Sequence, residues 1–186
     1  MAQDYQTLPA PVATYVRVVT GINRVLFRLA SLAMLAIVPL MLYAVIMRYV
    51  FNAPSPWAME LALMIFGPYF LLGGPYLLHT RGHVNMDLIE RGASPRTRRL
   101  FQMMNYPIII AFCFILLIYA VPFAADSFAY RETSFSTWNP QIWPVKLAIP
   151  VALLLMGLQA IAEWLRVLFG DPSALIRHEH DPEEMV

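Results

Sequence analysis

Residues 29–47 read LASLAMLAIVPLMLYAVIM, a stretch without a single charged side chain. A helix needs about 20 residues to cross the roughly 30 Å of hydrocarbon in a bilayer. Arg28 and Arg48 flank the stretch, so charge returns where the lipid headgroups would begin. This segment therefore predicts a helix that spans a membrane.

Three further uncharged stretches follow, at residues 61–78, 100–125 and 147–162. The last can be extended in both directions, because Lys146 can snorkel outward and Glu163 and Arg166 can lie at the opposite interface. Continuous apolar runs favour helices over barrel strands, which alternate with a period of two. We therefore expect an all-α integral membrane protein, a single domain over residues 1–186, with four transmembrane helices at about 25–48, 58–80, 100–125 and 144–169.

The composition agrees with a membrane protein. Hydrophobic residues make up 59% of the chain and charged residues 13%, whereas soluble domains are about 45–50% apolar and about a quarter charged. The formal net charge of +1 gives no electrostatic reason to expect nucleic acid as a partner. A single cysteine, Cys113, cannot form a disulfide within the chain and gives no redox or metal signal.

Basic residues predict the orientation, because Lys and Arg accumulate in cytoplasmic segments. Most of the 13 basic residues fall in the N-terminal flank, the loop between the second and third spans, and the C-terminal flank. Only Arg48, Arg131 and Lys146 lie on the other side. Both termini are therefore expected in the cytoplasm. The middle loop has a pattern compatible with a short interfacial helix, and residues 176–186 with a mobile acidic tail.

Four residues in the second span are separated by sevens: Glu60, Gly67, Gly74 and Arg81. On one helix they form a stripe, and glycines allow a neighbouring helix to approach closely. We interpret the stripe as a helix-contact face; the alternative is that the glycines relieve strain beside Pro68 and Pro75. Glu60 is also a candidate coupling carboxylate, but its interfacial position favours a structural ion pair with Arg48.

His79, His83 and Asp87 are separated by fours, a spacing that would align metal ligands along a helix. Gly82 interrupts that helix at the membrane exit, so a simple interfacial cluster is the favoured interpretation. The sequence contains no phosphate-binding loop, GxSxG, HExxH or paired-cysteine motif. We therefore expect neither an enzyme nor a cofactor.

Three motifs resemble a known family. The first is Arg48-Tyr49-Val50-Phe51-Asn52 followed by Pro54, Trp57 and Glu60; the second is Gly82-His83-Val84-Asn85-Met86-Asp87; the third is Trp143-Pro144. In this order, over residues 46–164 of a four-span chain, they resemble the small membrane subunit of tripartite ATP-independent periplasmic (TRAP) transporters. The resemblance assigns Gly82, His83 and Asp87 to a motif at the cytoplasmic end of the second span.

The resemblance implies a multi-pass protein of the bacterial inner membrane, surrounded by lipids and bound to a large membrane subunit. A periplasmic solute-binding protein would deliver an organic acid to this complex. Uptake would be driven by an ion gradient, usually of sodium, with ion and substrate sites in the large subunit. The small subunit would be an accessory scaffold. We expect its outer loops, through Asp126, Arg131, Glu132 and Trp138, to help dock the binding protein.

Two alternative functions predict features that this sequence lacks. A small four-helix drug exporter would carry a carboxylate deep in its first span, and residues 29–47 have none. A haem-binding membrane anchor of a redox enzyme would carry histidines within separate spans, and these are missing as well. A scaffold with no site of its own fits the sequence better than either.

Overall fold

The computed structural model describes residues 9–80 and 95–169. It contains four helices: α1 (Ala10–Tyr49), α2 (Pro56–His79), α4 (Pro95–Ala129) and α5 (Trp143–Phe169). All four are long and apolar enough to cross a membrane, which confirms the predicted all-α fold. β pairing in these residues is limited to one isolated bridge between Thr133 and Gln141.

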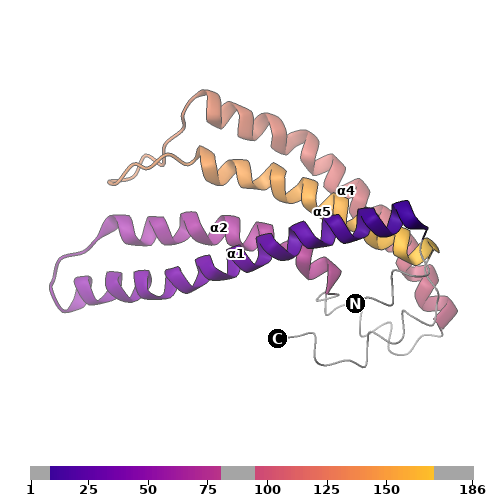
Figure 1. The fold of residues 1–186 in the computed structure, drawn as a ribbon. Helices are drawn as coiled ribbons and strands as arrows, with labels where there is room; N and C mark the ends of the chain where they lie inside the picture. Colours follow the sequence, from indigo (N-terminus) through magenta and orange to yellow (C-terminus); the bar gives the residue numbers. More distant parts are fainter. Residues whose placement is uncertain (1–8, 81–94, 170–186) are drawn as a thin grey trace.

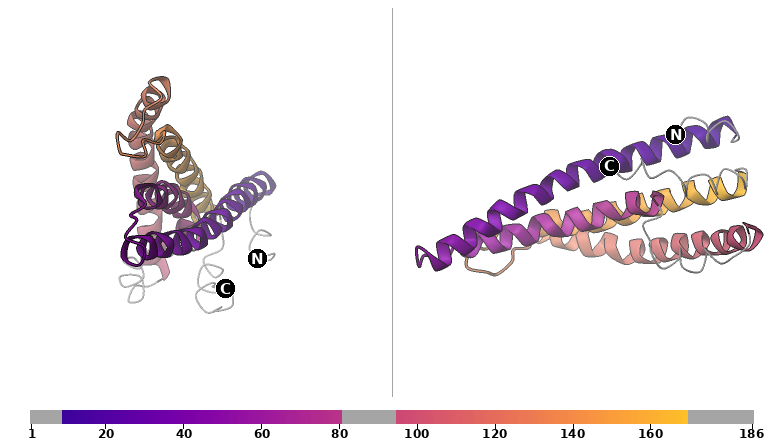
Figure 2. Two further views of the ribbon diagram at one scale, coloured as in Figure 1. Left: turned by 90° about the vertical axis from the view of Figure 1, so that its left-hand side faces the viewer. Right: turned by 90° about the horizontal axis from the view of Figure 1, so that it is seen from below.

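The helices form two hairpins, α1–α2 and α4–α5 (Figure 1). Both hairpin loops, residues 50–55 and 130–142, lie at the same end of the molecule, here named the tip end. The starts of α1 and α4 and the end of α5 lie at the opposite, terminal end. α2 packs against α1 and α5, and α5 packs against α4 as well as α2. Figure 2 shows that α1 runs obliquely to the other helices, and its first half crosses α5.

Two helices are longer than the uncharged stretches suggest. α1 begins at Ala10 rather than near residue 25, and α4 begins at Pro95 and ends at Ala129. α1 has 40 residues and is therefore about 60 Å long at 1.5 Å per residue, about twice the hydrocarbon thickness. Its early part is helical because one face, with Ala13, Val16 and Val19, is buried against the bundle. α2 and α5 agree with the predicted spans to within two residues.

The buried core lies toward the terminal end, where α2, α4 and α5 meet. It is built from Leu78, Tyr106, Ala160 and Val167, with Met156 among the partly buried side chains around it. Alanines are frequent among the buried residues, as expected where helices pack closely in lipid. Large apolar side chains remain exposed along the helices, which suits a surface that faces lipid or another membrane protein.

The predicted interfacial helix between the second and third spans and the acidic tail at 176–186 lie outside the described residues. The same holds for Arg81, Gly82, His83 and Asp87.

Candidate functional site

A cluster of polar side chains joins three helices near the terminal end. Gln159 of α5 is fully buried, and its amide oxygen accepts a hydrogen bond of 2.8 Å from Nδ2 of Asn23 on α1. Its amide nitrogen donates to Thr20 of α1 at 3.3 Å and to Glu163 at 2.8 Å. Nearby, the Tyr15 hydroxyl donates to the carbonyl of Leu158 at 3.1 Å. These bonds fix the crossing of α1 over α5.

The same cluster contains a buried carboxylate, that of Glu163. Oε1 of Glu163 lies 2.8 Å from Nδ1 of His79 at the end of α2, and 3.4 Å from the Arg166 guanidinium one turn further along α5. Glu163 is 6% exposed. An unpaired carboxylate at such a position would be costly, whereas a paired and hydrogen-bonded one is tolerated. Glu163 therefore links α2 to α5 and, through Gln159, to α1.

This cluster is a structural device rather than a chemical site. Most of its polar atoms bind one another, and Oδ1 of Asn23 is buried without a hydrogen-bond partner. The charged side chains of the described helices lie outside the uncharged stretches of the sequence. Hydrogen bonds between helices in lipid contribute about 0.6 kcal/mol each on average and up to about 1.7. Several of them at one crossing hold α1, α2 and α5 in a defined arrangement.

The two glycines of the predicted contact stripe on α2 face α5 of the same chain. A Cβ placed on Gly67 would lie 3.5 Å from Cγ1 of Val145, and one placed on Gly74 would lie 3.9 Å from the Met156 sulfur. Both contacts are with α5. The stripe is thus used inside the chain, and Gly73 beside it faces Phe27 of α1.

The predicted ion pair between Arg48 and Glu60 is not formed. Glu60 lies near the start of α2, and its Oε2 accepts a hydrogen bond of 2.6 Å from the Ser136 hydroxyl. Arg48 is exposed on the last turn of α1, and the ion pairs recorded between described residues do not include it with Glu60. The short loop reverses the chain but does not turn these two side chains together. Glu60 instead ties α2 to the α4–α5 loop.

The α4–α5 loop has a defined conformation. Thr133 and Gln141 form its bridge, and the Ile142 amide donates to the Glu132 carbonyl at 2.9 Å. The Glu132 carboxylate forms an ion pair with Lys146 on the first turn of α5. The hydrogen bond and the positive charge from Lys146 lower the pKa of Glu132 below its ordinary value. Lys146 also lies 4.4 Å above the Phe123 ring.

Three residues of this loop, Arg131, Phe135 and Asn139, have a positive φ, at 46°, 55° and 51°. Asparagine adopts this conformation readily, but a bulky residue such as Phe135 does so rarely. Strain of this kind costs about 1–3 kcal/mol and persists only where the surroundings impose it. The loop is therefore specified by its bonds rather than by the preference of each residue.

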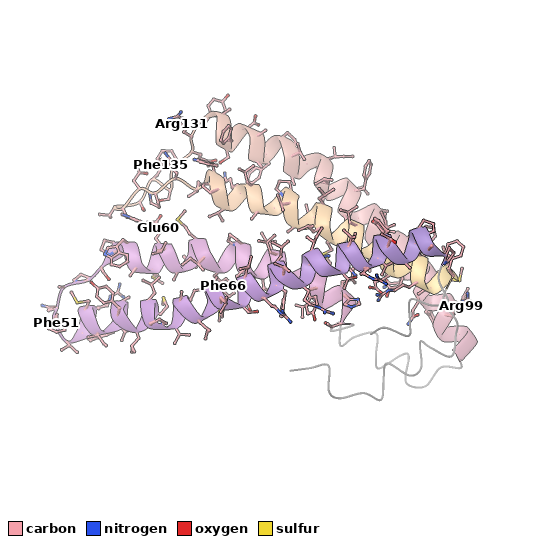
Figure 3. The ribbon with its side chains drawn as sticks, in the orientation of Figure 1. Phe51, Glu60, Phe66, Arg99, Arg131 and Phe135 are labelled. Carbon is pink, nitrogen blue, oxygen red and sulfur yellow. The ribbon has the colours of Figure 1, made fainter. Side chains whose placement is uncertain are left out.

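The candidate docking residues lie together at the tip end, where Figure 3 shows Arg131 and Phe135 near Glu60. Asp126, Arg131 and Trp138 are exposed. Glu132 is half-buried in its ion pair with Lys146, so it shapes the loop in addition to carrying charge. The α1–α2 loop contributes Phe51, which is also exposed.

The candidate metal ligands are not brought together within the described residues. His79 binds Glu163, while His83 and Asp87 lie outside the described part of the chain. Over residues 9–80 and 95–169, no group of three or more His, Cys, Asp or Glu side chains is arranged to hold a metal ion.

The cluster around Gln159 was not predicted from the sequence, where Glu163 and Arg166 were expected only to lie at the interface opposite the snorkelling Lys146. The signal was present: Gln159, Glu163 and Arg166 follow a spacing of four and three, so they share one helix face. A polar stripe at the end of an apolar helix indicates a polar partner. The partners Thr20 and Asn23 could not be identified, because they precede the apolar stretch of α1.

Comparisons with known proteins agree with the fold. A family model described as "Tripartite ATP-independent periplasmic transporters, DctQ component" matches residues 37–170. The chain is 28% identical, over 125 residues, to the C4-dicarboxylate TRAP transporter small permease protein DctQ of Vibrio cholerae serotype O1. The match covers 65% of this chain and 47% of that relative, so the chain spans about half of the relative's length.

Proposed function

Because the chain belongs to the family of DctQ components of tripartite ATP-independent periplasmic transporters, we propose that it is the small, non-transporting subunit of such an importer. The family is one of transporter components, which sets aside the enzyme anchor and the drug exporter. It also agrees with the four apolar helices in placing the protein in the bacterial inner membrane as a multi-pass protein. In the proposed complex the chain binds a large transport subunit and supports a docked solute-binding protein.

The observation that carries the scaffold role is the use of the polar side chains. Asn23, Gln159 and Glu163 bind other residues of the bundle, and the stretches 29–47, 61–78, 100–125 and 147–162 carry no charge. A transport pathway for an anionic solute and its coupling ion needs polar or charged groups at membrane depth. The pathway and the coupling to sodium are therefore assigned to the large subunit.

The surface of α1 suits the contact with the large subunit. The stripe with Gly67 and Gly74 is covered by α5, so the partner must bind elsewhere. Large apolar side chains are exposed at short, helix-like intervals along α1; these are Val18, Ile22, Val25, Leu29, Leu32, Leu35, Val38, Leu42 and Val45. Intervals of three and four join them into a continuous apolar stripe, which winds around the helix because the mean interval is shorter than 3.6 residues. Neighbouring members such as Leu32 and Leu35 share a face that a second helix can pack against.

The solute is proposed only as a class. The relative from Vibrio cholerae is named for C4-dicarboxylates, and a small organic acid is our proposal for this system. Specificity would belong to the binding protein and the large subunit.

Co-purification tests the assignment. The affinity-tagged chain, expressed with the large subunit of the proposed transporter, is expected to retain that subunit through size-exclusion chromatography in mild detergent. Replacement of Leu32 and Leu35 by serine on the outward face of α1 should reduce the retained amount several-fold. Replacement of Leu100 and Met104 by serine, on exposed positions of α4, is the matched control. Recovery of the chain without the large subunit in every detergent would contradict the proposal.

A further inference from the structure

One side chain at the tip end is presented to its surroundings almost completely. Phe135, in the middle of the α4–α5 loop, is 88% exposed. Its neighbours along the chain are Ser134, Ser136 and Thr137. Phe135 therefore presents its ring between small polar neighbours along the chain, at the end where Figure 3 places Arg131 and Glu60 as well.

The backbone beneath Phe135 is held by specific bonds. The Phe135 amide donates to Oδ1 of Asn139 at 3.0 Å, and the Asn139 amide donates to the Ser136 hydroxyl at 3.0 Å. The Ser134 amide donates to the Pro140 carbonyl, also at 3.0 Å. Together these bonds keep Phe135 at a φ of 55°, a conformation that a phenylalanine in a free loop would avoid.

The loop is also fixed to the helices on both sides. The Ser136 hydroxyl donates to Glu60 of α2 at 2.6 Å, and Glu132 pairs with Lys146 of α5. At the base of the loop, the ring of Phe128 packs edge-on against Trp143, with 5.0 Å between ring centroids. The position of Phe135 is thereby set relative to both hairpins.

An exposed aromatic side chain on a rigid loop, with polar neighbours, has the features of an anchor residue in a protein interface. Aromatic residues that enter a pocket on a partner carry much of the binding energy of protein interfaces. A loop that is already ordered loses less entropy on binding. A side chain that served only to sit among lipid headgroups would need no imposed backbone conformation, and Trp and Tyr are the residues enriched at that depth.

We infer that Phe135 is the aromatic anchor by which this subunit holds the periplasmic solute-binding protein, its ring entering an apolar pocket on that protein's surface. The inference rests on the proposed docking role of the outer loops. A soluble partner that binds and leaves repeatedly needs an anchor that stays exposed between encounters. The ring lies at the tip end, where few basic residues are found. The basic-residue pattern assigns that end to the periplasmic side, from which a soluble binding protein arrives.

The test measures binding of the purified solute-binding protein to the complex of this chain and its large subunit in lipid nanodiscs, by biolayer interferometry. Phe135→Ala should weaken the affinity at least tenfold. Asn139→Ala keeps the Phe135 ring but removes the side-chain oxygen that accepts from the Phe135 amide. This variant should weaken the affinity several-fold. Tyr130→Ala removes another aromatic side chain of the same loop, which is 83% exposed, and should change the affinity less than twofold.

A paired variant separates the anchor from the docking role. Asp126→Asn combined with Arg131→Gln removes exposed charge near the loop without touching Phe135. If this variant weakens binding while Phe135→Ala does not, docking at this loop stands and the anchor is wrong. If neither variant changes the affinity, the docking role fails as well.

Two further outcomes would overturn the inference. One is loss of the large subunit from the Phe135→Ala complex, which would place the ring in a permanent contact. The other is insertion of the residue 135 side chain into the bilayer. A spin label attached to Phe135→Cys in a Cys113→Ala background would then relax faster with oxygen than with a water-soluble nickel complex. The expected result is the reverse preference, with quenching by the nickel complex.

Discussion

Asn23 donates a hydrogen bond of 2.8 Å to Gln159 across the crossing of α1 and α5, and the two residues are 136 positions apart in the chain. Both side chains are buried, at 1% and 0% exposure. The bond joins the first helix to the last and so closes the bundle. It is also the part of the fold for which the apolar pattern gave no indication.

Removal of this bond should loosen the crossing. Asn23→Ala leaves the Gln159 carbonyl buried without its donor, and we expect a loss of about 1–2 kcal/mol in the free energy of unfolding. The midpoint of thermal unfolding in detergent, followed by circular dichroism, measures the change. Thr14→Ala is the matched control, because the Thr14 hydroxyl is exposed and bonds only to Ala10 of its own helix. Equal midpoints for the two variants would argue against a structural role for the bond.

Glu163 should be more important than any other carboxylate in the described residues. Glu163→Ala leaves Arg166 and His79 without their shared acceptor, and breaking a buried pair from one side costs about 3–5 kcal/mol. Glu163→Gln keeps an acceptor and should cost less. Glu60→Gln, at the tip end, retains an oxygen that can accept from Ser136 and should stay close to wild type. The amount of protein that survives a heat step before size-exclusion chromatography measures the stability of the three variants. The predicted order would be wrong if Glu60→Gln were the least stable.

The limits of sequence interpretation follow from how each feature is encoded. The four helices were predicted because their signal is local: each apolar run is long enough to span a bilayer. The early half of α1 was not predicted to be helical, because Arg17, Arg24 and Arg28 interrupt its apolar pattern. It is helical through contacts with α5 that only the tertiary structure supplies.

The candidate sites divide in the same way. The stripe with Gly67 and Gly74 was interpreted as a helix-contact face, and α5 of the same chain lies beside both glycines. The sequence could not say which helix that neighbour is. The ion pair of Arg48 with Glu60 was predicted from proximity along the chain. In the structure Glu60 accepts a hydrogen bond from Ser136 of the α4–α5 loop instead. The conformation of Phe135 depends on Asn139 and Ser136 acting together, which no residue preference predicts.

The glycine stripe gives a size-dependent prediction. At Gly67 a methyl group meets Val145 at an ordinary contact distance of 3.5 Å, so Gly67→Ala should be tolerated. Gly67→Leu extends into α5, and overpacking of this kind costs about 1–3 kcal/mol. Gly21→Leu is the control, since a Cβ there meets no atom within 4 Å. Thermal midpoints in detergent test the order, and a Gly67→Leu protein as stable as Gly21→Leu would show that α2 and α5 are not in close contact.

The ion pair of Glu132 with Lys146 predicts a pH dependence. Because the pKa of Glu132 is lowered in the folded protein, the pair stabilises the loop at and above the ordinary carboxyl pKa. That contribution is lost as the pH falls through the lowered value. An NMR titration of the Glu132 amide shift in detergent should therefore show a lower midpoint in wild type than in Lys146→Met. Equal midpoints would mean that Lys146 does not hold the carboxylate.

Transport in reconstituted vesicles tests most directly whether this chain is a support without a pathway of its own. Vesicles containing this chain alone, the large subunit alone, or both are given the paired solute-binding protein, a radiolabelled organic acid that it binds, and an inward sodium gradient. We predict uptake with both subunits and only background counts with this chain alone. Accumulation of the acid in vesicles that contain this chain without the large subunit would contradict the proposed division of labour.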